Sequence, residues 1–137
     1  MTLTYDDVLT ARAAIADATL LTPTVPATRL SLQLGIDLHL KLENLQHTNA
    51  FKARGALAKL LSLTDEERRA GVIACSAGNH AQGVAYHATR LGITSVIVMP
   101  HGTPFNKIKR TQDFGATVEL HGKTFEEAME ATREMMA

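Results

Sequence analysis

The sequence is poor in cysteine: among 137 residues, only Cys75 carries a thiol. A single cysteine cannot form a disulfide within the chain, and proteins without disulfides are typical of reducing compartments. The chain also has no excess of either charge, since 14 Lys and Arg residues balance 14 Asp and Glu residues. This balance argues against a surface for nucleic acid or anionic membrane, which needs clustered basic side chains. We therefore expect a cytoplasmic protein with no nucleic-acid partner.

Long apolar runs are absent as well. A helix that spans a bilayer needs about 20 consecutive apolar residues, and no segment approaches that length. The first seven residues, MTLTYDD, contain no basic region followed by an apolar core, so they indicate no secretory signal. None of the six histidines stands four residues from another, which is the helical spacing of zinc ligands. The sequence therefore predicts neither a membrane partner nor a metal site.

Strand and helix signals alternate along the chain, which is typical of a parallel sheet with helices on both faces. Leucines at 38, 40 and 42 alternate with polar residues, which predicts a half-buried strand over residues 37–43. A continuous apolar run predicts a fully buried strand over 72–75. Further strands are predicted over 95–99 and 117–120, with helices over 6–18 and 79–91 and after residues 52, 64, 103 and 124. We expect an α/β fold, with a βαβαβ unit from residue 49 onward.

Lys52 stands between Phe51 and an alanine-rich helical segment. A lysine held against apolar neighbours loses hydration of its ammonium form, so its pKa falls and the neutral amine can form a Schiff base with an aldehyde. Most lysines beside apolar residues instead bury only the stem and keep the charged head in water. Lys41 fits this second description, because its strand phase points it away from the apolar face. Taken alone, Lys52 leaves both interpretations open.

A second motif, SAGNHAQG over residues 76–83, follows the apolar run that ends at Cys75. A strand that ends in a small, polar, glycine-bearing turn and opens a helix forms an anion site from free backbone amides and the helix dipole. The same backbone shape also occurs in purely structural turns. At the end of a predicted buried strand, Cys75 is expected to be an inert core thiol. Together with Lys52, the turn indicates a Schiff-base lysine beside a carboxylate site.

Eight pieces of the chain follow one another in a recognisable order and cover nearly its whole length. They are Thr22-Pro23, LKLENLQ over 40–46, FKARGA over 51–56, SAGNHAQG over 76–83, Met99-Pro100, Thr103-Pro104, Lys107 and Gly115-Ala116. In this order they resemble the fold-type II pyridoxal phosphate enzymes, and most closely the threonine (serine) dehydratases. The resemblance implies the small α/β domain of such an enzyme, preceded by the N-terminal segment of its large domain.

The resemblance also implies roles for individual residues. Lys52, preceded by Phe51, binds pyridoxal 5'-phosphate and acts as the catalytic residue, and Asn79 contacts the cofactor ring. The substrate carboxylate is expected at Ser76, Ala77, Gly78, Asn79 and His80. Lys52 then removes the α-proton of L-threonine or L-serine, and β-elimination yields 2-oxobutanoate or pyruvate plus ammonia. This is the reaction of a threonine ammonia-lyase, a lyase of amino-acid metabolism that includes isoleucine biosynthesis.

Two features depart from the family pattern. Ala50 stands where many members have a serine, so a hydroxyl near the lysine is missing. No two of the nine glycines are adjacent, so the glycine-rich loop that holds the cofactor phosphate in the family is not among these 137 residues.

The length predicts a part of a two-domain enzyme. We expect residues 1–48 to be a segment that packs on a missing large domain, and residues 49–137 to be a small α/β domain truncated in its last helix. That helix has a predicted capping box at Thr124 and Glu127 but no stop signal. The complete enzyme is expected to be a homo-oligomer, and this part alone inactive. Two alternatives remain: a serine racemase-like enzyme, and a non-catalytic folded module that lacks the phosphate loop.

Overall fold

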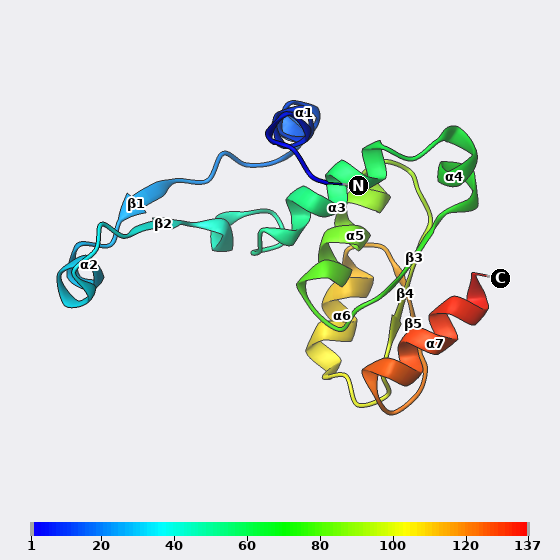
Figure 1. The fold of residues 1–137 in the computed structure, drawn as a ribbon. Helices are drawn as coiled ribbons and strands as arrows, with labels where there is room; N and C mark the ends of the chain where they lie inside the picture. Colours follow the sequence, from blue (N-terminus) through cyan, green and yellow to red (C-terminus); the bar gives the residue numbers. More distant parts are fainter. Residues whose placement is uncertain (1, 137) are drawn as a thin grey trace.

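The computed structural model describes residues 2–136, which form an α/β body and a projecting arm (Figure 1). The chain opens with α1 (Tyr5–Ile15), followed by a short 3-10 turn, η1 (Ala16–Ala18). The arm, defined as residues 24–41, consists of β1 (Thr24–Pro26), α2 (Thr28–Leu34) and β2 (His39–Lys41). Its two strands pair antiparallel. The chain then returns to the body through the 3-10 turn η2 (Glu43–Leu45).

The body is built on a parallel sheet of three strands, in the order β3 (Val72–Cys75), β4 (Ser95–Met99) and β5 (Thr117–Leu120). One face of this sheet is covered by α5 (Asn79–Arg90) and α6 (Phe105–Asp113), and the other by α7 (Phe125–Met135) (Figure 1). The remaining helices are α3 (Lys52–Leu61), which packs on α5, and α4 (Asp65–Ala70). Helices on both faces of a parallel sheet confirm the predicted fold class.

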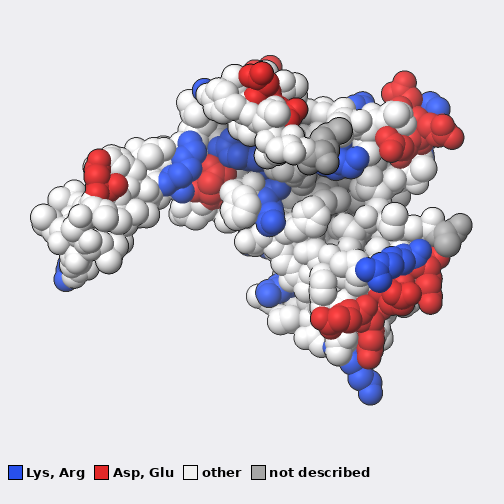
Figure 2. Space-filling model, viewed as in Figure 1, with Lys and Arg blue, Asp and Glu red and all other residues white. Residues whose placement is uncertain are grey.

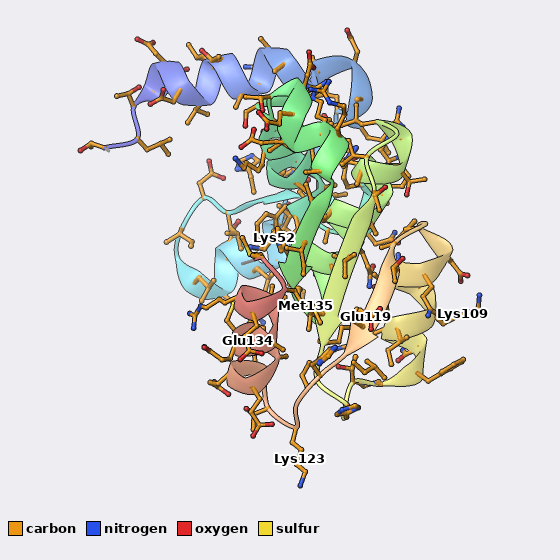
Figure 3. The ribbon with its side chains drawn as sticks, turned by 90° about the vertical axis from the view of Figure 1, so that its right-hand side faces the viewer. Lys52, Lys109, Glu119, Lys123, Glu134 and Met135 are labelled. Carbon is orange, nitrogen blue, oxygen red and sulfur yellow. The ribbon has the colours of Figure 1, made fainter. Side chains whose placement is uncertain are left out.

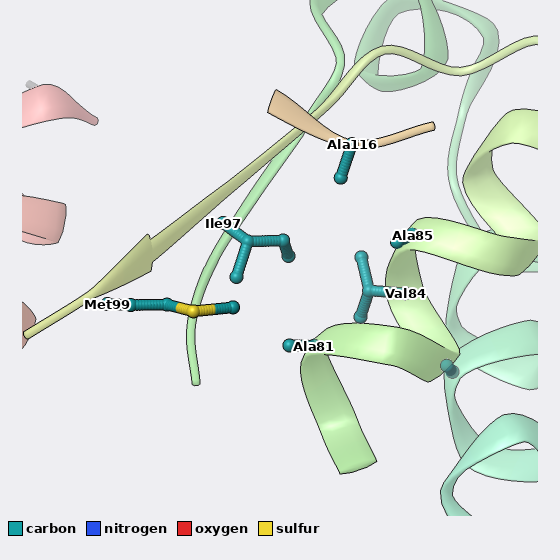
Figure 4. Close-up of a cluster of buried hydrophobic side chains, with 7 residues drawn as sticks. Ala81, Val84, Ala85, Ile97, Met99 and Ala116 are labelled. Carbon is teal, nitrogen blue, oxygen red and sulfur yellow. The ribbon is translucent and has the colours of Figure 1, made fainter. Parts of the chain in front are cut away.

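The main core lies between α5 and the central strand β4 (Figure 4). Ala81 and Ala85 of α5 and Ile97 and Met99 of β4 are completely buried. Full burial of a side chain such as isoleucine contributes roughly 1.5–3 kcal/mol relative to exposure. The small alanines bring the helix backbone close to the sheet, and the large strand side chains fill the space between them. This contact fixes the position of α5, and therefore of the turn that precedes it.

The helix ends largely follow the sequence signals. Thr64 accepts a hydrogen bond from the Glu67 N–H, and the Glu67 carboxylate accepts one from the Thr64 N–H, so the predicted capping box at α4 is confirmed. The box predicted at α7 is only half right. Thr124 accepts from the Glu127 N–H, but the Glu127 carboxylate accepts from the Lys123 N–H instead.

Several burial predictions are wrong. All four residues of β3 are only half-buried, because β3 is an edge strand that pairs with β4 alone. The strand predicted over residues 37–43 is shorter in the structure, where β2 covers only His39–Lys41. Leu40 of this strand is 41% exposed, because no element among the described residues covers it. The helix predicted over residues 6–18 ends at Ile15 and continues as η1. Among residues 2–136, no helix combines the length and apolar character needed to cross a membrane.

Candidate functional site

Lys52 is the first residue of α3, where the chain enters the body (Figure 3). Its side chain is exposed, and its Nζ lies 5.2 Å from the centroid of the Phe51 ring, which is itself 61% exposed. An exposed cation over an aromatic ring gains about 0.5–1 kcal/mol. The idea that apolar neighbours enclose this lysine is therefore wrong for the described residues. The buried neighbours are the small residues Ala50 and Ala53, which anchor the backbone rather than cover the amine.

The turn between β3 and α5 is organised by Ser76. Its Oγ accepts hydrogen bonds from the N–H groups of Gly78 and Ala81, each over 3.3 Å. In the part of the chain that the structure describes, the N–H groups of Asn79 and His80 have no acceptor. Two free amides at the positive end of a 12-residue helix form a site suited to a carboxylate or another anion. The Ser76 hydroxyl thus shapes the turn, while the following amides are the groups free to bind.

Contacts between α3 and α5 bring Lys52 and this turn together. Gly83, one turn along α5, lies so close to α3 that a Cβ there would be 3.2 Å from the Lys52 carbonyl carbon and oxygen. The pKa of His80 is lowered, first by loss of water around the imidazole and then by the positive charge of Lys52. The amine of Lys52 is therefore within electrostatic reach of the amino end of α5. The two sequence motifs form one region of the surface.

Cys75 is not a nucleophile of this region. Cys75 is half-buried, so the prediction that its thiol belongs to the core is wrong. Desolvation raises the pKa of this thiol, and a hydrogen bond with Thr132 lowers it by less. A raised pKa reduces the thiolate fraction at neutral pH and disfavours a nucleophilic role. Among residues 2–136, no cluster of three or more His, Cys, Asp and Glu side chains is placed to hold a metal ion.

One polar cluster next to the site is not predicted from the sequence. The Arg54 guanidinium donates two hydrogen bonds to the Glu43 carboxylate, from Nε over 2.9 Å and from Nη2 over 2.8 Å. The Thr22 hydroxyl donates to the same carboxylate over 2.5 Å. All three residues belong to the pieces LENLQ, FKARG and Thr-Pro that carry the family resemblance, which is the only sequence signal for them. Their hydrogen bonds connect residues 11 and 21 positions apart and so leave no local pattern.

The loop before Lys52 is held from both sides. Gln46 and Thr48 are each 1% exposed. Asn49 has a φ of +57°, a left-handed conformation that asparagine tolerates better than most residues. Its side-chain oxygen accepts a hydrogen bond from Arg110 of α6, and its side-chain nitrogen donates to the Asn44 carbonyl over 2.9 Å. The loop that delivers Lys52 is therefore tied to α6.

Comparison with known proteins agrees with this arrangement of motifs. The family model described as "Pyridoxal-phosphate dependent enzyme" matches residues 15–137. The chain belongs to this family, whose members depend on pyridoxal phosphate.

The chain is also similar to individual proteins named for their action on L-threonine. The chain is 45% identical over 129 residues to the L-threonine ammonia-lyase of Thermotoga maritima, covering 94% of this chain and 32% of that protein. It is 43% identical over 131 residues to the catabolic L-threonine dehydratase TdcB of Escherichia coli, covering 96% and 40%. The chain thus spans about a third to two fifths of the length of these curated relatives.

Solved structures show the same fold. The processed form of threonine deaminase isoform 2 from Solanum lycopersicum superposes with a TM-score of 0.84 at 38% identity, covering 98% of this chain and 39% of that chain. Maize serine racemase superposes with a TM-score of 0.92 at 30% identity, covering 99% and 41%.

Proposed function

We propose that the protein containing these residues is a pyridoxal-phosphate-dependent threonine ammonia-lyase, which converts L-threonine or L-serine to the 2-oxo acid and ammonia. The observation that carries this proposal is the placement of Lys52 against the amino end of α5, where the Asn79 and His80 amides are free. The names of the relatives from Thermotoga maritima and Escherichia coli support the choice of reaction. A role in isoleucine biosynthesis and a cytoplasmic location belong to the same proposal.

The described residues fit the cofactor in two respects. Lys52 offers an exposed primary amine, and the amino end of α5 offers amides for an anionic group. When bound, the cofactor supplies an electron sink for the carbanion that forms at the substrate α-carbon. We assign Lys52 and Phe51 to the cofactor side of the site, with Asn79 directed to the cofactor ring.

The substrate side is assigned to the turn over residues 76–80. The free amides of Asn79 and His80 hold the substrate carboxylate, and Ser76 keeps those amides in place by capping Gly78 and Ala81. Ala77 is half-buried against the core and fixes the path of the turn. With the carboxylate anchored, the Lys52 Nζ removes the α-proton, and the β-hydroxyl takes up a proton and leaves as water.

Replacement of Lys52 tests the assignment directly. In the full-length chain, Lys52→Ala is expected to abolish turnover of L-threonine and the cofactor adduct that borohydride traps on the lysine. Lys59→Ala is the matched control, because Lys59 is exposed on the same helix α3. Turnover or trapped adduct retained in Lys52→Ala at the control level would overturn the assignment. Asn79→Ala is expected to lower turnover with the adduct still formed, and unchanged turnover would show that the Asn79 side chain has no role at the cofactor ring.

A racemase is the second candidate, favoured by the superposition on maize serine racemase. The same carbanion yields the opposite enantiomer if it is reprotonated instead of losing its β-hydroxyl. Incubation of the full-length protein with L-serine separates the two, because a lyase releases pyruvate and a racemase releases D-serine. A folded module without either activity would give neither product.

We further propose that residues 1–48 pack on a large domain outside this sequence, whereas residues 49–137 form the small α/β domain. The surface of the arm supports this division, since it is mostly uncharged (Figure 2). Leu32 and Leu34 of the arm are 81% and 60% exposed. Assembly of the complete enzyme as a homo-oligomer is part of the same proposal.

A further inference from the structure

We propose that Glu43 and Arg54 are positioning residues for Lys52: their ion pair clamps the first turn of α3 to the segment after the arm and so fixes where the lysine amine stands. This inference rests on the proposed function, because it assumes that Lys52 is the reacting group. It concerns residues to which neither the motifs nor the relatives assign a role.

The Glu43–Arg54 pair has a well-defined geometry. Two parallel hydrogen bonds of 2.9 and 2.8 Å join the Arg54 fork to both oxygens of Glu43. The Glu43 side chain is only 15% exposed and that of Arg54 only 28%. A bidentate, charge-assisted pair that is partly shielded from water holds its geometry far better than an exposed single contact. By contrast, the side chains of the Glu130–Arg133 pair on α7 are 64% and 69% exposed and share a single 2.9 Å contact.

The Glu43–Arg54 pair joins several segments of the chain. Arg54 Nη2 also donates to the Leu20 carbonyl over 2.8 Å, and the Thr22 hydroxyl donates to Glu43. Lys41, from the end of β2, donates to the Thr22 carbonyl over 2.5 Å. The chain after α1, the end of the arm and the start of α3 therefore meet at one carboxylate. The positive charge of Arg54 lowers the pKa of Glu43 through the hydrogen bonds between them, so the carboxylate is ionised at neutral pH.

Among the described residues, no side chain caps the start of α3. Phe51, the N-cap of α3, makes no side-chain hydrogen bond to the first turn. A helix start without a cap frays, and Lys52 is its first residue. Gly83 of α5 supports the Lys52 backbone from one side. Arg54 is two residues further along, which places its side chain about 200° around the helix from that of Lys52. Arg54 therefore acts on Lys52 through the backbone and not by contact with the amine.

Three measurements on the full-length chain test the inference: amide exchange in the first turn of α3, the dissociation constant of pyridoxal phosphate, and kcat. Glu43→Gln keeps the size of the side chain but removes its charge. We expect roughly tenfold faster exchange over residues 52–55 and a higher dissociation constant of pyridoxal phosphate. We also expect a loss of kcat of roughly 10- to 100-fold, as small displacements of reacting groups produce. Arg54→Lys keeps the positive charge but loses the two-pronged guanidinium. Its exchange rate and kcat should therefore lie between those of wild type and Glu43→Gln. Glu130→Gln, which removes the exposed pair, is the matched control and should change none of the three.

The outcomes separate the inference from the proposed function. If the amide protons of residues 52–55 exchange as fast in Glu43→Gln as in wild type, the ion pair does not hold the first turn of α3 and the inference is overturned. If exchange accelerates while cofactor affinity and kcat stay unchanged, the pair is only structural and the inference is also overturned. If the wild-type protein takes up no cofactor on Lys52, the proposed function fails, and faster exchange in Glu43→Gln would still establish that the pair holds the first turn.

Discussion

At the scale of single residues, Gly83 sets the distance between the helices that carry the two motifs. Gly83→Ala would place a Cβ 3.2–3.3 Å from backbone atoms of Lys52 and Ala53, so α3 must move by a few tenths of an ångström. Overpacking of this kind costs about 1–3 kcal/mol, against a gain of about 1 kcal/mol in helix propensity. We expect a net loss of about 1 kcal/mol in the free energy of unfolding, measured by urea denaturation.

Gly55 provides the matched control for that substitution. It lies inside α3, and a Cβ added there would meet no atom within 4 Å. Gly55→Ala should therefore raise the free energy of unfolding by up to about 1 kcal/mol. Equal effects of the two substitutions would show that close helix packing at Gly83 does not matter.

His87 gives the fold a dependence on pH. It is 1% exposed, and burial, followed by the charges of Arg90 and His47, lowers its pKa to about 4. The unfolded chain binds a proton on this histidine near pH 6.5, whereas the folded chain does not until about pH 4. The free energy of unfolding should therefore fall as the pH decreases through this window, by up to about 3 kcal/mol.

Urea denaturation at a series of pH values measures this loss. His87→Leu should reduce the fall in the free energy of unfolding between pH 6.5 and 4. Replacement of the exposed His101 by Asn should leave that fall as in wild type. The assignment to His87 would be wrong if the leucine variant declined as steeply as the wild type.

At the scale of elements, α4 depends on its cap. None of its six residues is buried, so it is held by hydrogen bonds: the capping box of Thr64 and Glu67, and the two that the Arg68 guanidinium donates to the carbonyls of Leu63 and Leu61. Thr64→Ala is expected to cost about 1 kcal/mol locally, which corresponds to roughly fivefold faster amide exchange over residues 65–70. Exchange in the buried strand β4 should not change. Ser62→Ala, which removes an exposed hydrogen bond to the Lys59 carbonyl just outside α4, is the control; an equal effect of both variants on α4 would contradict the prediction.

At the scale of the whole molecule, the arm exposes a run of apolar side chains. Leu32, Leu34 and Ile36 are each more than half exposed, and the arm carries few charges (Figure 2). Apolar surface of this extent promotes association. We expect the 137-residue chain to associate with rising concentration in sedimentation velocity, and Leu32→Gln combined with Leu34→Gln to reduce that association. Association unchanged in the double variant would place the contact elsewhere, for example on Leu3 and Tyr5 near α1.

The fold class, the strands of the body and the cap of α4 were predictable because each depends on residues close together in sequence. Apolar runs mark β3 and β4, and Thr64 and Glu67 stand three residues apart in one turn. The candidate site was predictable as two motifs, and the sequence order placed the turn over residues 76–80 at the end of a parallel strand. The predictions of burial at β3 and Lys52 were wrong, because burial depends on which other elements cover a residue.

The roles of Glu43, Arg54 and Gly83 emerge only from the folded chain. Glu43 and Arg54 are 11 residues apart in a pattern that no helix or strand period links, and Gly83 meets the Lys52 backbone across 31 residues of chain. Local sequence specifies which residues are helical, extended or chemically reactive, since these properties follow from backbone preference and side-chain type. Where the reactive lysine stands, and what holds it there, follows from long-range packing, which exists only once α3, α5 and the arm have come together.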